Sequence, residues 1–178
     1  MNDASNIYLI GYRCTGKTTI GRALSEYFHR PFADTDLLIQ HQINAGITEF
    51  VHSKGWDPFR EIESQILNAV SKTPGQVVST GGGIILNSEN RKCLMKTGIN
   101  IWLQADISVI AARIQNDLKS AETRPSLTGN PIEDEVRQVM ADRLPFYEEV
   151  ADLTVDTSCL SLKQIVNLIK EELSHVRK

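Results

Sequence analysis

The chain has 178 residues, which suffices for a sizeable core, and we expect residues 1–178 to form a single domain. Its 19 Lys and Arg residues nearly balance 22 Asp and Glu residues, so the formal net charge of −3 offers no overall attraction to nucleic acid or to an anionic membrane. Three cysteines without a C-x-x-C pair indicate neither a disulfide framework nor a zinc site, and they favour a reducing compartment.

Apolar runs typical of strands alternate with segments whose apolar residues recur at helical spacing. This alternation predicts an α/β fold with a parallel sheet and crossover helices that cover it. The expected strands are residues 6–10, 32–34, 76–80, 99–104 and 152–156, and the clearest helical patterns are residues 58–70 and 161–173.

Residues 11–18 fit the spacing G-x-x-x-x-G-K-[ST] of a phosphate-binding loop. An apolar run precedes them and a helical pattern follows, so the order strand, loop and helix favours a phosphate site over a glycine turn that matches by chance. Backbone N–H groups would surround the phosphates, Lys17 would meet the β- and γ-phosphate oxygens, and the Thr18 hydroxyl would hold Mg²⁺. The expected ATP-binding residues here are Gly11, Cys14, Thr15, Gly16, Lys17, Thr18 and Thr19.

Two carboxylates, Asp34 and Asp36, follow the second apolar run. The carboxyl ends of parallel strands are where ligands bind in open α/β sheets, so both are candidate site residues. The alternative is that one of them only caps the helix expected to begin near Leu37.

Arg60 follows Asp57-Pro58, a good pair for the N-cap and first position of a helix, which predicts that Arg60 lies in the first turn. The helix dipole disfavours a cation there by about 0.3–1 kcal/mol. An anionic ligand would explain the arginine, since guanidinium forms two parallel hydrogen bonds with a carboxylate. An ordinary ion pair with Glu63 is the alternative.

Three consecutive glycines, Gly81, Gly82 and Gly83, follow the expected strand 76–80. Either a close approach of the backbone to a ligand or a tight turn would require them.

The polar segment at about 117–130 predicts a mobile lid, within which Arg124 would neutralise charge on a transferring phosphoryl group. A solvated surface role is the alternative for Arg124. Before this segment, Asp106 is expected to cap a helix rather than bind metal, and Arg113 would either stack on a base or form a surface ion pair.

Arg143 lies on an apolar helical stripe, so its charge needs a protein or ligand partner. Pro145 is expected to disturb the helix beyond it. The stripe consists of Val136, Met140, Arg143, Tyr147 and Val150.

Several motifs occur together in the order and spacing found in shikimate kinases, which this chain resembles over nearly its whole length. They are the loop 11–18, Asp34-Thr35-Asp36, Phe59-Arg60, Gly81-Gly82-Gly83, Arg124-Pro125 and Arg143-Leu144-Pro145-Phe146-Tyr147. The resemblance implies a P-loop kinase fold like that of nucleoside monophosphate kinases, with a five-stranded parallel sheet in the order 2-3-1-4-5, flanking helices and a mobile lid. It also implies ATP-dependent phosphorylation of the 3-hydroxyl of shikimate, giving shikimate 3-phosphate and ADP in chorismate and aromatic amino acid biosynthesis.

The resemblance further assigns roles to individual residues. Arg60 and Arg143 would hold the shikimate carboxylate, the Gly82 main chain would contact substrate, and Asp36 would contact the ring hydroxyls. Chemistry suggests that Asp36 accepts or orients the proton of the attacking hydroxyl. Asp34 would face Mg²⁺ through water. The expected catalytic residues are Lys17, Asp36 and Arg124.

Three other functions are alternatives to this one. The chain lacks an Asn-Lys-x-Asp motif and an Asp-x-x-Gly motif, so a regulatory GTPase is disfavoured. A kinase of gluconate or another sugar acid is the nearest alternative, and a non-catalytic nucleotide-binding regulator is a further one. With no secretory signal and no long apolar stretch, we expect a cytoplasmic monomer that binds a small molecule and neither nucleic acid nor membrane.

Overall fold

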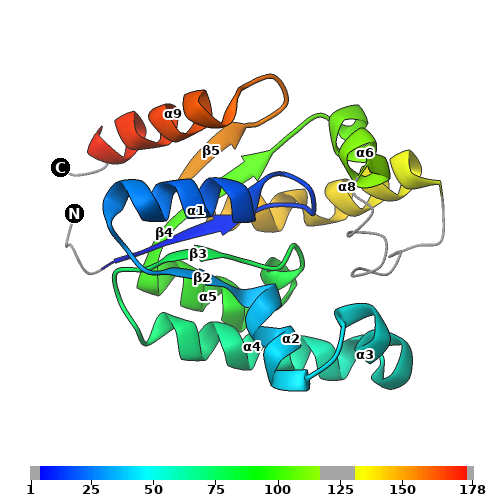
Figure 1. Cartoon of the computed structure of the whole chain (residues 1–178). Helices are drawn as coiled ribbons and strands as arrows, with labels where there is room; N and C mark the ends of the chain where they lie inside the picture. The colour runs from blue at the N-terminus through cyan, green and yellow to red at the C-terminus, as the bar shows by residue number, and fades with distance from the viewer. Residues whose placement is uncertain (1–4, 117–130, 176–178) are drawn as a thin grey trace.

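The computed structural model describes residues 5–116 and 131–175, and its centre is a five-stranded, wholly parallel sheet (Figure 1). The strand order is β2-β3-β1-β4-β5, which confirms the order expected from the resemblance. The strands are β1 (Asn6–Ile10), β2 (Phe32–Asp34), β3 (Val77–Ser79), β4 (Gly98–Gln104) and β5 (Leu153–Asp156).

Helices cover both faces of the sheet (Figure 1). Their bounds are α1 (Lys17–Phe28), α2 (Thr35–Ile43), α3 (Ile47–Lys54), α4 (Trp56–Ser71), the short 3₁₀ helix η1 (Ile84–Leu86), α5 (Ser88–Thr97), α6 (Ile107–Asn116), α8 (Ile132–Val150) and α9 (Leu162–His175). The five strands lie within one residue of the expected ranges, and α6 begins directly after Asp106, as expected of a helix that Asp106 would cap.

Alternation along β1 divides the core into two layers, because successive strand residues face opposite sides. Ile7 and Leu9 pack with residues of α1 and α9 on one face. Tyr8 and Ile10 pack with residues of α2 to α5 and α8 on the other. Because all the strands are parallel, their carboxyl ends lie at one edge of the sheet, where the loops that follow β1, β2 and β3 meet.

Three sequence expectations about helices were wrong. Helix α2 begins at Thr35, two residues before the expected start near Leu37, and its N-cap is Asp34, so the capping alternative given for the two carboxylates holds for Asp34. Helix α4 begins at Trp56 after Gly55, whose φ of 88° an L-residue adopts only with strain, so Asp57 is not its cap.

The third wrong expectation concerned Pro145. Helix α8 continues through it to Val150. Within residues 5–116 and 131–175, none of the helices combines the length and the apolar character needed to cross a bilayer.

Candidate active site

The phosphate loop, residues 11–18, joins β1 to α1 in a conformation that depends on its glycines. Gly11 and Gly16 have φ of 138° and 93°, and a Cβ on Gly11 would overlap the Leu103 carbonyl oxygen. Because α1 begins at Lys17, the unpaired N–H groups and the positive dipole end of this helix lie at the loop. The loop therefore has the geometry of a phosphate site.

Lys17 is 5% exposed and folds back over the loop. Its ammonium group donates hydrogen bonds to the carbonyl oxygens of Gly11, at 2.9 Å, and Tyr12, at 2.7 Å. Thr15 is also buried, with its hydroxyl bonded to the Tyr12 carbonyl at 2.8 Å, whereas Thr19 is exposed on the first turn of α1. Any phosphate contact of Thr15 would thus come from its backbone.

Oxygen donors from three elements meet beside the loop. Thr18 Oγ1 donates to Asp34 Oδ2 at 2.8 Å and lies 3.3 Å from Ser79 Oγ. The other oxygen of Asp34 caps α2 by accepting from the amides of Asp36, at 3.1 Å, and Leu37, at 3.4 Å. Hydroxyl and carboxylate oxygens are the ligands that Mg²⁺ prefers, and this ion commonly keeps several waters, so the donor set fits it. Sequence reasoning missed Ser79, which pairs with Asp34 in the sheet register.

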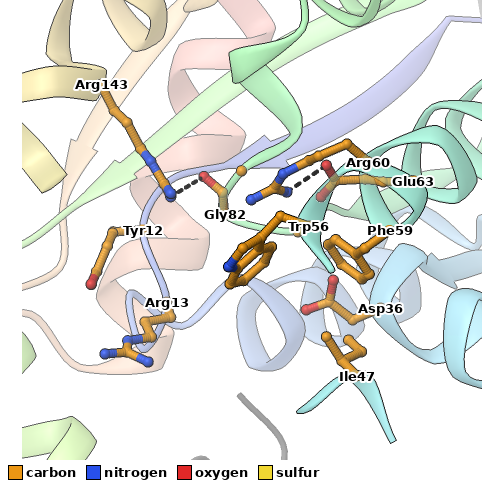
Figure 2. Close-up of a pocket in the computed structure, with 12 residues that line it drawn as sticks. Tyr12, Arg13, Asp36, Ile47, Trp56, Phe59, Arg60, Glu63, Gly82 and Arg143 are labelled. Atoms are coloured by element: carbon orange, nitrogen blue, oxygen red, sulfur yellow. Dashed lines mark hydrogen bonds and ion pairs between the residues drawn. The ribbon is translucent and has the colours of Figure 1, made fainter. Parts of the chain in front are cut away.

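A pocket lies next to the loop, between α2, α3, α4, α8 and the glycines after β3 (Figure 2). It encloses about 500 Å³ of space, including open solvent at its mouth. We call it the Arg60–Arg143 pocket, and its lining consists of Tyr12, Arg13, Asp36, Ile47, Trp56, Phe59, Arg60, Glu63, Gly81, Gly82, Gly83 and Arg143. Asp36, Arg60, Gly82 and Arg143, all predicted from the sequence, are thus brought together.

Arg60 lies in the second turn of α4, because the helix begins earlier than expected, and it forms the ion pair with Glu63 that was the alternative to ligand binding. The atoms Arg60 Nη1 and Glu63 Oε2 are 2.6 Å apart. The guanidinium lies 5.1 Å from the Trp56 ring centre and 5.2 Å from that of Phe59. Since Arg60 still lines the pocket, the ion pair orients the guanidinium without removing it from the pocket wall (Figure 2).

Glu63 was missed as a site residue. Its side chain is only 2% exposed, and this burial raises the pKa of its carboxyl group above the ordinary value of 4.5, while the positive charge of Arg60 opposes the rise. The signal in the sequence was its position three residues after Arg60 on a helix.

Arg143 points inward from α8, as its stripe predicted, and is 7% exposed. It donates to the Gly82 carbonyl oxygen at 3.0 Å, and Tyr147 donates to the same oxygen at 2.8 Å. Burial raises the pKa of Tyr147 to about 12, so the phenol stays a donor. A neutral carbonyl leaves the charge of Arg143 uncompensated by this contact, so the group remains suited to an anion.

The glycines after β3 are required by the side chains around them. A Cβ on Gly81 would lie 2.7 Å from Glu63 Oε1 and 2.8 Å from Asp36 Oδ1, and one on Gly83 would overlap the Arg60 guanidinium. None of the three has a positive φ. Close approach by the site's own side chains, rather than backbone strain, thus accounts for Gly81 and Gly83.

Two further arginines, Arg113 and Arg124, are also sequence candidates for the nucleotide site. Among the described contacts, Arg113 forms no surface ion pair but donates to the carbonyl oxygens of Thr157, at 2.6 Å, and Cys14, at 3.3 Å, and so links the phosphate loop to the segment after β5. Its stacking on a base stays a prediction. Arg124 and the lid at 117–130 lie outside the described residues.

Comparison with known proteins gives consistent results. The family model described as Shikimate kinase matches residues 13–174. Shikimate kinase 2 of Yersinia pestis (strain Pestoides F) is 42% identical over 170 residues, covering 94% of this chain and 97% of the relative. The solved structure of shikimate kinase from Acinetobacter baumannii in complex with shikimate superposes with a TM-score of 0.91 at 31% identity, covering 98% of this chain and 95% of that one.

A gluconokinase from Sinorhizobium meliloti also matches, with a TM-score of 0.57, 18% identity and full coverage of both chains. At that identity the likeness concerns the fold alone.

Proposed function

The chain belongs to the shikimate kinase family, and we propose how its own residues divide the work of phosphorylating shikimate. The enzyme transfers the γ-phosphoryl group of ATP to the 3-hydroxyl of shikimate and yields shikimate 3-phosphate and ADP, a step of chorismate and aromatic amino acid biosynthesis. The observation that supports the division best is the adjacency of the phosphate loop to the Arg60–Arg143 pocket, with Tyr12 and Arg13 belonging to both.

ATP would bind with its phosphates against the backbone N–H groups of residues 11–19. Lys17 is already within the loop, and its ammonium would exchange the Gly11 and Tyr12 carbonyls for β- and γ-phosphate oxygens. Thr18 would hold Mg²⁺, with Asp34 facing the ion through water, which agrees with their hydrogen bond. The ion, when bound, neutralises charge on the phosphates.

Shikimate would bind in the Arg60–Arg143 pocket with its carboxylate between the two guanidinium groups, since each can form paired hydrogen bonds to a carboxylate. Arg60 is oriented by Glu63 and Arg143 by its bond to Gly82. The Gly82 backbone would also approach the substrate closely.

Asp36, 8% exposed at the end of α2 nearest the loop, would orient the acceptor hydroxyl and take its proton as the oxygen attacks phosphorus. Because phosphoryl transfer depends mainly on alignment and charge stabilisation, the fixed position of both ligands would supply much of the rate. Arg124 would add positive charge at the transferring group.

A substrate panel separates this function from a sugar-acid kinase and from a nucleotide-binding regulator. We expect ADP release with shikimate and none above background with gluconate. The methyl ester of shikimate lacks the anion and serves as the control for the two arginines. Its KM should be much higher than that of shikimate. Turnover of gluconate in place of shikimate, or ATP binding without any turnover, would contradict the proposal.

Further proposals concern the whole protein. We infer that residues 1–178 act as one domain and as a monomer in the cytoplasm. The single sheet supports the first, and the three cysteines, which include no C-x-x-C pair and fit a reducing compartment, support the last. Size-exclusion chromatography with light scattering tests the monomer.

A further inference from the structure

Glu135, in the first turn of α8, carries a buried carboxylate that none of the roles above uses. It forms an ion pair with the guanidinium of Arg13 and accepts a hydrogen bond from the Tyr12 hydroxyl at 3.4 Å. Both partners belong to the phosphate loop, more than 120 positions earlier in the chain. Glu135 therefore ties the loop directly to α8.

The same helix meets the loop a second time through Arg143, eight residues or about two turns further on. Arg143 holds the Gly82 carbonyl, and its guanidinium carbon lies 5.9 Å from the Tyr12 ring centre. Gly82 in turn packs on the loop, since a Cβ there would lie 3.3 Å from the Gly11 oxygen and 3.4 Å from the Arg13 nitrogen. The loop is thus connected to α8 at two points along the helix, at Glu135 and at Arg143, and two such points fix both the distance and the tilt between the loop and the helix.

This geometry matters because the two elements serve different ligands. The loop holds the donor phosphate, whereas α8 supplies one of the two guanidinium groups for the acceptor. If the loop and α8 were slightly misaligned, each ligand could still bind to its own element. In-line transfer, however, requires the γ-phosphorus and the acceptor hydroxyl to be aligned with each other. A misplacement of about 1 Å can lower a rate on the order of 100-fold.

We propose that Glu135 is a positioning residue that, through Arg13 and Tyr12, aligns the donor phosphate on the loop with the acceptor hydroxyl held beside α8. The inference rests on the proposed division of the site. A buried carboxylate loses hydration, and Arg13 together with the N-terminal dipole of α8 offsets that cost.

The variant Glu135→Gln keeps the shape of the side chain and an acceptor for Tyr12 but removes the charge. We expect kcat with shikimate to fall about tenfold or more, while the Kd of shikimate alone and of MgADP alone change less than about twofold. Glu133→Gln is the matched control, because Glu133 is an exposed carboxylate in the same turn and its substitution removes the same negative charge from the N-terminal end of α8. It should keep the native kcat.

A double-mutant cycle with Arg13→Gln completes the experiment. If Arg13 and Glu135 act as a unit, the double variant loses no more kcat than the worse single variant. The double variant also removes both charges and leaves neither one buried without its partner. Its kcat can therefore be measured even if Glu135→Gln alone unfolds. A native kcat in Glu135→Gln or in the double variant overturns the proposal, as does a loss confined to one ligand's Kd. Absence of shikimate turnover in the unmutated protein contradicts the proposed function instead.

Discussion

Thr18 and Asp34 are joined by a hydrogen bond of 2.8 Å from Thr18 Oγ1 to Asp34 Oδ2, which links the first turn of α1 to the end of β2. Asp34 also caps α2 with its other oxygen. One carboxylate thus serves the phosphate loop and the helix that carries Asp36, so its charge and its capping function can be tested separately.

Asp34→Asn should change the requirement for Mg²⁺ without unfolding α2, because asparagine is as good an N-cap as aspartate. We expect the Mg²⁺ concentration for half-maximal turnover to rise at least about tenfold, since the hydration shell of the ion loses an anionic partner. Thermal unfolding should change little. The control is Asp106→Asn, an exposed carboxylate at the end of β4, and an unchanged Mg²⁺ dependence of Asp34→Asn would refute the metal role.

Arg143→Lys keeps the charge and loses the planar fork. The lost hydrogen bonds to a carboxylate correspond to about 1.5–3 kcal/mol, so we expect KM for shikimate to rise roughly 10- to 150-fold with little change for ATP. Arg137→Lys, on the exposed side of the same helix, should match the native enzyme. Steady-state kinetics with each substrate varied in turn makes the measurement, and an unaltered KM for shikimate counts against the carboxylate site.

Gly83→Ala tests whether the glycines make room for site side chains. The new Cβ would overlap the guanidinium of Arg60, which lies at the end of a flexible side chain, so the guanidinium should move and the fold should persist. We expect KM for shikimate to rise several-fold at nearly constant thermal stability. Gly46→Ala is the control, because a Cβ there meets nothing within 4 Å. A collapse of stability with unchanged KM would instead indicate a purely structural turn.

Glu63→Gln should reveal the raised pKa of the buried carboxyl group. A group whose pKa is higher in the folded state contributes stability that is fully present below its unfolded pKa, here 4.5, and is lost as pH rises through the folded value. The free energy of unfolding of the native protein, minus that of Glu63→Gln, should therefore increase when pH is lowered from 7.5 to 5. Urea unfolding of both proteins at the two pH values measures this difference. If the difference decreased at the lower pH, Arg60 would instead hold the pKa of Glu63 below its ordinary value.

Much of the fold was predictable from local pattern. Apolar runs separated by helical spacing located all five strands to within a residue, and the glycine and lysine spacing of the phosphate loop needs only eight neighbouring positions. The strand order came from the resemblance, because pairing between distant strands has no local signature. The early starts of α2 and α4 are not evident from the sequence, since Asp34 ends a strand and caps a helix at once and the N-cap of α4 is Gly55, which has no side chain to accept a capping hydrogen bond.

Several residues that line the pocket were predicted from the sequence, whereas the residues that hold them in place were missed. Arg60 and Arg143 stood out because a cation is unexpected in an early helical turn or on an apolar stripe. Glu135 and Ser79 did not stand out, because their partners lie in other segments and only the folded chain brings them together. The sequence presents a ligand and Glu63 as alternative partners of Arg60, whereas in the structure Arg60 pairs with Glu63 and also lines the pocket.

The most direct test of the proposed mechanism is the rate of phosphoryl transfer by Asp36→Asn, measured in a single turnover with shikimate and MgATP, alongside the Kd of MgATP. The substitution preserves size and removes the proton acceptor beside the attacking hydroxyl. We predict a rate loss of about 10²- to 10⁴-fold with the Kd of MgATP within about twofold of the native value. A transfer rate close to that of the native enzyme would contradict the role of Asp36 and the alignment of hydroxyl and phosphate built on it.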